Sequence, residues 1–240
     1  MSDDSKTKNE NDEVDEIESW DDLPDIKEDL LRGIYSYGFE KPSPIQKKAI
    51  LPIFNKTDIV AQAQSGTGKT GCFTIGVLQL IDVNVNKTQG IILSPTRELS
   101  LQIKKVIDSI GTMMKKLKTH LLVGGQSVES DINDLKSNPH IIIGCPGRVY
   151  DMLNRKRLLI DNLKIFVLDE ADEMLSYGFK DQIYNIFQFL PNDIQLALFS
   201  ATMPSSIENL VEKLTIKPKK ILVKAEQLTL EGIEQYYVTL

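Results

Sequence analysis

Cysteine and histidine are scarce in this chain, which has two of each among its 240 residues. Cys72 and Cys145 lie far apart and form no Cys-x-x-Cys pair, so a zinc site built from cysteine and histidine is not expected. Two isolated thiols are typical of a reducing compartment, which favours the cytoplasm, with the nucleus as the alternative.

Long apolar segments are missing as well. No apolar run approaches the ~18 residues that a membrane-spanning helix needs. The N-terminus is too acidic and polar to be typical of a signal peptide. We therefore expect no contact with a membrane.

The chain also has no excess of positive charge. The chain has 28 basic and 34 acidic residues, but residues 1–19 alone hold eight acidic and two basic side chains, which leaves 26 of each sign in the remainder. An acidic total therefore does not exclude a nucleic-acid partner, because local basic patches decide such binding. Since residues 1–19 also contain few apolar side chains, we expect a disordered acidic tail there and an ordered domain over 20–225.

Short apolar runs alternate with amphipathic segments from residue 58 onward. The runs predict strands at 59–63, 91–94, 121–123, 141–144, 165–168, 196–200 and 221–223. Helical spacing of apolar residues predicts helices at 26–36, 43–55, 69–80, 98–113, 148–153 and 181–190. Strands separated by helices favour an α/β fold with a mainly parallel, twisted sheet that has helices on both faces.

A glycine-rich turn follows the first of these strands. Ala63-Gln64-Ser65-Gly66-Thr67-Gly68-Lys69-Thr70 is similar to a phosphate-binding P-loop, although Ala63 stands where the pattern has glycine. Backbone N–H groups of the turn from Ser65 to Gly68, together with the positive end of the next helix, would bind phosphates. Lys69 would reach the β- and γ-phosphates, and the Thr70 hydroxyl would bind Mg²⁺. The alternative is a plain glycine turn with a surface lysine.

Three carboxylates follow the apolar run 165–168, in Asp169-Glu170-Ala171-Asp172. Open α/β sheets bind ligands at the carboxyl ends of their strands. We expect Asp169 to hold Mg²⁺ and Glu170 to orient and deprotonate the attacking water, whereas Asp172 is better placed for contacts with neighbouring motifs. An acidic helix start favoured by the helix dipole would explain one carboxylate, but not the coincidence of all three with a P-loop.

Together these segments resemble the DEAD-box RNA helicases, which are named for the four residues at 169–172. The resemblance covers nearly the whole chain from Trp20. It implies a RecA-like P-loop domain that binds ATP and Mg²⁺, contacts single-stranded or locally unwound RNA, and uses Asp169, Glu170 and Lys69 in catalysis.

Residues 38–46 are similar to the family's adenine-recognising Q motif. The amide of Gln46 can both donate and accept at the adenine edge, and Phe39 offers a ring face to the base. A lone glutamine would be a surface residue in most chains, and its spacing to Lys69 is the feature that matches.

Three further segments resemble the family's RNA-contacting motifs: Pro95-Thr96-Arg97, Gly124-Gly125 and Pro146-Gly147-Arg148. Each follows an apolar run, so all three should lie at one edge of the sheet. Backbone N–H groups, hydroxyls and arginines bind phosphate and sugar and carry little sequence information, while 2′-hydroxyls favour RNA over DNA. The segment from Ser200 to Thr202 resembles the motif that couples the ATP site to RNA separation, and Asp172 is expected to share that role.

The last residues predict more protein beyond this chain. Residues 226–240 read as an interdomain linker and the start of a second RecA-like domain, since the strand-like run 233–240 has nothing to pair with. The family's arginines from that second domain are missing here, so the chain alone is expected to be weakly active. That domain and translation-initiation scaffold proteins are the implied partners, and a monomer is expected.

Within the family, residues 30–46, 167–184 and 228–237 look most like helicases of translation initiation, with an exon-junction-type paralogue as the alternative. Two other classes stay open. One is a one-domain fragment that binds RNA or protein without turnover. The other is a small-molecule kinase, which Ala63 and the Q motif disfavour.

Overall fold

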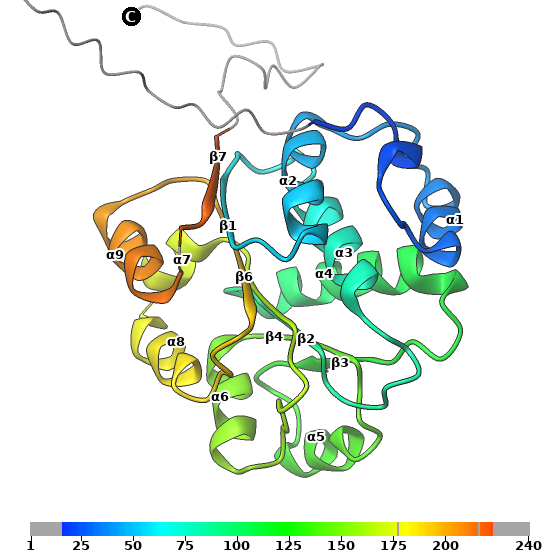
Figure 1. The fold of residues 1–240 in the computed structure, drawn as a ribbon. Helices are drawn as coiled ribbons and strands as arrows, with labels where there is room; N and C mark the ends of the chain where they lie inside the picture. The colour runs from blue at the N-terminus through cyan, green and yellow to red at the C-terminus, as the bar shows by residue number, and fades with distance from the viewer. Residues whose placement is uncertain (1–15, 177, 216, 223–240) are drawn as a thin grey trace, which may run out of the picture.

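A parallel β-sheet forms the centre of the molecule. The computed structural model describes residues 16–176, 178–215 and 217–222, and within them seven strands lie in the spatial order β3-β4-β2-β5-β6-β1-β7 (Figure 1). The strands are β1 Ile59–Gln62, β2 Gly90–Leu93, β3 Thr119–Leu122, β4 Ile141–Gly144, β5 Ile165–Leu168, β6 Gln195–Ser200 and β7 Lys219–Leu222. Every pairing among them is parallel, so the predicted strands and their direction are confirmed.

Helices cover both faces of the sheet, as parallel strands require. The buried side chains of α1 Glu28–Ser36, α2 Pro44–Phe54, α3 Lys69–Leu80 and α4 Arg97–Ile110 belong to one core cluster. The second cluster contains those of α5 Val128–Leu135, α6 Pro146–Asn154, α7 Ala171–Ser176, α8 Lys180–Phe187 and α9 Ser205–Leu214. Short 3₁₀ turns lie at η1 Trp20–Asp22 and η2 Gly111–Met113. In this described part of the chain no helix has the length and hydrophobicity needed to cross a membrane.

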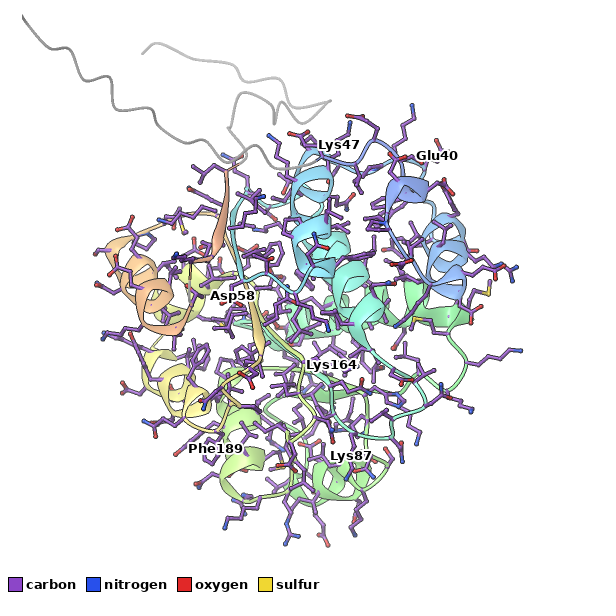
Figure 2. All side chains as sticks on the ribbon, in the orientation of Figure 1. Glu40, Lys47, Asp58, Lys87, Lys164 and Phe189 are labelled. Atoms are coloured by element: carbon purple, nitrogen blue, oxygen red, sulfur yellow. The ribbon has the colours of Figure 1, made fainter. Side chains whose placement is uncertain are left out.

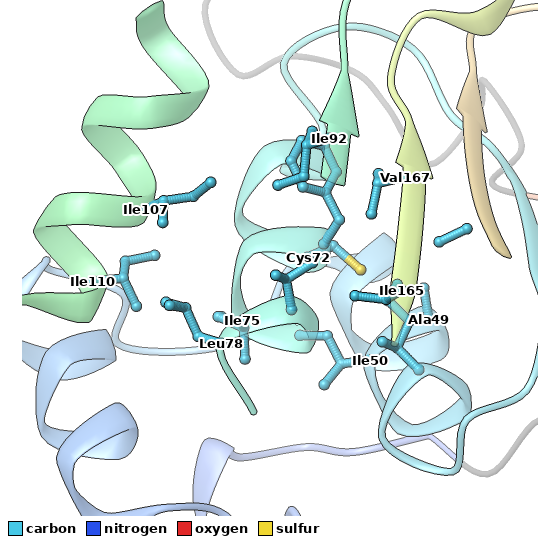
Figure 3. Close-up of a cluster of buried hydrophobic side chains, with 14 of the residues drawn as sticks. Ala49, Ile50, Cys72, Ile75, Leu78, Ile92, Ile107, Ile110, Ile165 and Val167 are labelled. Atoms are coloured by element: carbon cyan, nitrogen blue, oxygen red, sulfur yellow. The ribbon is translucent and has the colours of Figure 1, made fainter. Parts of the chain in front are cut away.

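The strands contribute alternate residues to the two cores. In β5, Ile165 and Val167 face the α1–α4 side, while Phe166 and Leu168 face the α5–α9 side. Figure 3 shows Ile165 and Val167 beside Cys72 of α3. Because successive side chains of a strand point to opposite faces, a run of four apolar residues is what a strand covered on both sides needs.

Side-chain hydrogen bonds close the amino-terminal edge of the sheet. The Asp58 carboxylate accepts a hydrogen bond from the backbone N–H of Leu196 at 2.8 Å, and Lys164 Nζ donates to the carbonyl of Leu80 at 2.9 Å (Figure 2). Gln195 adds a bond from Nε2 to the Thr57 carbonyl at 2.7 Å. These bonds connect neighbouring segments at this edge, and the opposite edge carries the glycine-rich turn and the carboxylates.

Residues just before Trp20 also contact the core. Ile17 is buried, and its backbone N–H donates to the Lys47 carbonyl of α2 at 3.2 Å. Glu18 and Lys47 also form an ion pair. Ile17 and Glu18 therefore attach the residues before Trp20 to α2. The rest of the predicted tail, residues 1–15, and the predicted linker at 226–240 lie outside the described residues.

Trp20→Ala should destabilise the fold and loosen the residues around Phe39. Trp20 is fully buried, its indole N–H donates to the Phe39 carbonyl at 2.9 Å, and the two rings stack. Loss of a buried aromatic costs about 3–5 kcal/mol of unfolding free energy. Urea unfolding should be followed by circular dichroism, because Trp20 is the chain's one tryptophan. Trp20→Phe is the control: it keeps most of the packing and should cost clearly less, and equal costs would contradict the packing role.

Candidate functional site

The carboxyl ends of the strands divide the predicted functional residues into two groups. Strands β1, β6 and β5 are neighbours, and the glycine-rich turn, Ser200 and Asp169 lie at their ends. Strands β2, β4 and β3 are the other neighbours, and the three predicted RNA-contacting segments follow them. The order of the strands therefore separates the residues predicted to bind nucleotide from the segments predicted to contact RNA. We call these two parts of the edge the nucleotide half and the RNA half, after the predicted roles.

The glycine-rich turn has the backbone conformation that an anion-binding loop needs. Gly66 and Gly68 have φ values of +82° and +97°, which side chains rarely allow. A Cβ on Gly68 would lie 2.7 Å from the Ser43 hydroxyl. Helix α3 begins at Lys69 without a side-chain cap from the described residues, so the positive end of the helix faces the turn. Ser65 and Gly66 are exposed, whereas Thr67 is buried, with its hydroxyl bonded to the Gln64 carbonyl at 2.8 Å.

Lys69 and Glu170 meet across this half of the edge. The Lys69 side chain is only 5% exposed, and its Nζ lies 2.9 Å from Glu170 Oε1 and 3.0 Å from the Ala63 carbonyl. A buried ammonium needs such partners, because desolvation of an unpaired charge is costly. Glu170 also has a φ of +51°, a left-handed conformation that is strained for a non-glycine residue and is typical of functional sites.

The Asp169 carboxylate is suited to binding a cation. It is 4% exposed, and its Oδ1 has no hydrogen-bond partner within the described residues. Burial, followed by the nearby Glu170 carboxylate, raises the pKa of Asp169 to about 7. A divalent cation would give Oδ1 a partner and favour the charged form, and the half-buried Thr70 hydroxyl in the first turn of α3 is a second oxygen ligand of the right kind. The residues present thus fit a Mg²⁺ ion.

Gln46 lies against the glycine-rich turn rather than open to solvent. Its Oε1 accepts from the Ser43 backbone N–H at 2.8 Å, and its Nε2 donates to the Gly68 carbonyl at 3.1 Å. One N–H and one lone pair remain for a base. Phe39 is half-buried, and the position of a Cβ on Gly71 would be 2.7 Å from its ring. The Q-motif residues therefore also brace the turn, a role that the sequence did not reveal.

Asp172 contacts the neighbouring motif, as its position after β5 suggested. Its Oδ2 accepts from the Thr202 backbone N–H at 2.9 Å and from the Thr202 hydroxyl at 2.6 Å, and Ser200 Oγ donates to the Thr202 carbonyl at 2.7 Å. Burial alone would raise the pKa of Asp172, but the hydrogen bonds that the carboxylate accepts, including those from Thr202, outweigh it and hold the pKa below its ordinary value. These contacts join the ends of β5 and β6.

The second half of the edge presents an arginine and helix N-termini. Arg97 is exposed at the start of α4, and its Nη1 lies 3.2 Å from the position of a Cβ on Gly125, which has a φ of +83°. Gly124 and Gly147 are also exposed. Helix α6 lacks a side-chain cap from any described residue, so N–H groups near Gly147 remain available to an anion.

Four residues expected at an RNA surface are buried or contact other parts of the domain. Pro95 is buried before α4, and Pro146 is buried at the start of α6. The Thr96 hydroxyl oxygen caps α4 by accepting from the Leu99 N–H at 3.2 Å. Arg148 turns inward and forms an ion pair with the buried Asp131.

Comparison with known proteins agrees with this geometry. A sequence profile described as DEAD/DEAH box helicase matches residues 43–210, which is more than half of the chain. This chain belongs to that family. In this family member, the matched span includes Lys69, Glu170 and the three segments of the RNA half.

Similar curated proteins are translation factors of this family. The chain is 55% identical to eukaryotic initiation factor 4A of Cryptosporidium parvum over 93% of its length, and 52% identical to the ATP-dependent RNA helicase eIF4A of Pyricularia oryzae over 92%. It spans 55% and 56% of those two proteins, or about half of their length.

Solved structures of DEAD-box proteins have the same fold. A DEAD box protein from Methanococcus jannaschii matches 88% of this chain with a TM-score of 0.83 at 39% identity, over 57% of its own length. S. cerevisiae Dbp5 bound to RNA and ADP BeF3 matches 91% of the chain with a TM-score of 0.78 at 35% identity, over 55% of its own length. The expected RecA-like α/β domain is thus confirmed.

Three contacts near the predicted site residues of this DEAD-box domain were not predicted from the sequence. Ser43 donates its hydroxyl to the Thr67 carbonyl at 2.8 Å, Glu170 pairs with Lys69, and Asp131 pairs with Arg148. Ser43 lies within the Q motif, so the motif could have indicated that Ser43 lies near the glycine-rich turn. Nothing in the polar segment 128–135 distinguishes Asp131, because its surroundings depend on how β3 and α6 pack against α5.

Asp169→Asn should change how stability depends on pH. The folded pKa of about 7 exceeds the ordinary value of 3.8. Between these values the folded chain binds more protons than the unfolded chain, so the wild type loses stability as the pH rises through this window. The Asp169→Asn chain has no carboxylate at this position and does not lose stability in this way. Its free energy of unfolding should therefore rise relative to the wild type by more than ~1 kcal/mol between about pH 5 and about pH 8, since one pKa unit corresponds to about 1.4 kcal/mol. Urea unfolding at both pH values measures it, and a constant difference would contradict the raised pKa.

Proposed function

We propose that this chain is the ATP-binding, RNA-contacting half of a DEAD-box RNA helicase that acts in translation initiation. The observation that carries the proposal is the meeting of Lys69, Asp169 and Glu170 at the strand ends, beside a second group of strands with RNA-contacting segments. The similarity to initiation factor 4A proteins supports the place in translation.

Different residues of the nucleotide half contact different parts of ATP. The turn from Ser65 to Gly68 and the start of α3 bind the phosphates through N–H groups. Lys69 supplies the positive charge, and Gln46 and Phe39 contact the adenine. Thr70 and Asp169 would hold Mg²⁺, which neutralises charge on the phosphates when bound.

The Lys69–Glu170 ion pair has a consequence for hydrolysis. Lys69 Nζ donates to Glu170 at 2.9 Å and to the Ala63 carbonyl at 3.0 Å, so a bound phosphate would compete with Glu170 for the ammonium group. When Lys69 leaves, the Glu170 carboxylate becomes free to orient a water molecule and accept its proton. The ion pair thus keeps the base occupied until a phosphate competes for the lysine.

The RNA half would hold the phosphates and sugars of single-stranded or locally unwound RNA. Arg97, the loop at Gly124 and Gly125, and the N-terminus of α6 at Gly147 are the exposed groups suited to this. The bonds between Asp172 and Thr202 link the nucleotide half to the β6 end and would couple ATP binding to RNA separation.

The whole reaction would need more than this span. Since the chain covers about half of its curated relatives, we place a second RecA-like domain of a longer protein among its partners. That domain would supply arginines to the ATP site, and such arginines can raise turnover by orders of magnitude. Translation-initiation scaffold proteins are the further partners, a cytoplasmic location fits this role, and the chain itself would act as a monomer.

Lys69→Ala should weaken binding of Mg-ATP on the order of 100-fold, because a charge partner inside a buried site is lost. Isothermal titration calorimetry measures the affinity, and circular dichroism checks that the fold is intact. Lys104→Ala is a matched control, since Lys104 pairs with Asp108 on the surface of α4 and should leave binding unchanged. Unchanged affinity in Lys69→Ala would remove Lys69 from the site.

Steady-state ATP hydrolysis with and without single-stranded RNA tests the proposed function. We expect slow turnover that RNA stimulates little in this chain, and strong RNA stimulation once a second RecA-like domain is joined to it. Glu170→Gln keeps the shape and removes the base, so it should bind Mg-ATP at least as tightly and show no turnover. Binding of ATP without any turnover in either protein would instead favour a binding module.

A further inference from the structure

Arg148 lies in the RNA half but does not face solvent. Its side chain is only 11% exposed and is held by two partners. One is the carboxylate of Asp131 in the first turn of α5, through Nη1. The other is the backbone carbonyl of Gln126, to which Nη2 donates at 2.8 Å. The guanidinium therefore bridges a buried acid and the residue directly after Gly125.

The burial and surroundings of the Asp131 carboxylate favour binding of this guanidinium. It is fully buried, and its Oδ1 faces the Nε2 of His120 on β3 at 3.6 Å, where neither atom has a hydrogen-bond partner in the described residues. A buried carboxylate without a cation would be unstable, and the planar fork of arginine suits two acceptors at once.

A metal ion is the competing explanation for this cluster. Ligand atoms of His120, Asp131 and Asp134 lie within 4.8 Å of one another. Arg148, however, already provides the positive charge at Asp131, and Asp134 is exposed to solvent. The cluster is therefore better explained as a polar support for the guanidinium.

The loop that Arg148 holds is the one expected to meet RNA. Gly124, Gly125 and Gln126 are all exposed, and Gly125 adopts a φ of +83°. Arg97 is exposed, and its Nη1 lies 3.2 Å from the position of a Cβ on Gly125. The loop is thus near an exposed arginine and is also bonded to an arginine that faces inward.

We propose that Asp131 and Arg148 are positioning residues for RNA binding: Asp131 orients Arg148, and Arg148 fixes the loop at residues 124–126 through the Gln126 carbonyl. Arg97 and the loop backbone then make the contacts with RNA phosphates, and Arg148 makes none. This inference rests on the proposed RNA-binding function, and it reverses the role that the sequence predicted for Arg148.

Nuclear magnetic resonance of the ¹⁵N-labelled chain can test the proposal with a ten-nucleotide oligouridylate as the probe. Asp131→Asn and Arg148→Lys should each shift the amide signals of Gly124, Gly125 and Gln126 in the free chain. Each should also weaken binding of the oligonucleotide on the order of tenfold, because a charged hydrogen bond that fixes the loop is lost. The dependence of affinity on salt should match the wild type, since no phosphate contact is removed.

A direct phosphate contact by Arg148 predicts the opposite pattern. Arg148→Lys would then keep most of the affinity, Asp131→Asn would leave it equal or tighter, and Arg148→Met would reduce the salt slope by about 0.7. Any of these results would overturn the proposal. If Asp131→Asn does not fold, the comparison of Arg148→Lys with Arg148→Met decides, because positioning predicts equal losses with an unchanged salt slope.

Two controls separate this proposal from the proposed function. Arg155→Lys alters the arginine directly after α6, which pairs with the partly exposed Asp151, and it should change neither the loop signals nor the affinity. Affinity for Mg-ATP should be the same in all variants. A wild-type chain that binds no oligonucleotide would refute the RNA part of the proposed function, whereas the loop signals of the free variants still decide whether Asp131 and Arg148 position the loop.

Discussion

The ion pair between Lys69 and Glu170 joins two segments that lie a hundred residues apart in the chain. Lys69 begins α3 after β1, and Glu170 follows β5, with only β6 between the two strands. A parallel sheet is what brings both strand ends to one edge. The buried ammonium in turn requires a partner there, because unpaired charge is costly away from water. The geometry of the nucleotide half therefore depends on the strand order and on this one pair.

The RNA half is built on the same edge and is physically connected to the nucleotide half. Strands β2 and β5 are neighbours at the boundary, and the Asp169 N–H donates to the Leu93 carbonyl at the end of β2 at 2.9 Å. On the other side of Asp169, the Asp172 carboxylate holds Thr202. Backbone and hydrogen bonds thus connect Asp169 with the turn that carries Arg97 and with the end of β6.

Much of this arrangement could be predicted because it depends on local pattern. Apolar runs predicted the seven strands, and the P-loop and acidic motifs predicted by residue type and spacing that Lys69 and Asp169 belong to one site. What could not be predicted depends on packing between distant segments. The sequence shows that Arg148 is an arginine after a strand, but not that a buried Asp131 turns it inward. It likewise shows Ile17 in an acidic segment, but not the core contact that orders it.

A crystal structure of this chain with Mg²⁺ and a non-hydrolysable ATP analogue tests the central claim most directly. The account predicts that phosphates bind at residues 66–70, that Lys69 Nζ moves from Glu170 to a phosphate oxygen, and that Asp169 holds the Mg²⁺ ion. A nucleotide bound elsewhere, or one bound at the turn while Lys69 and Glu170 remain paired, would contradict it.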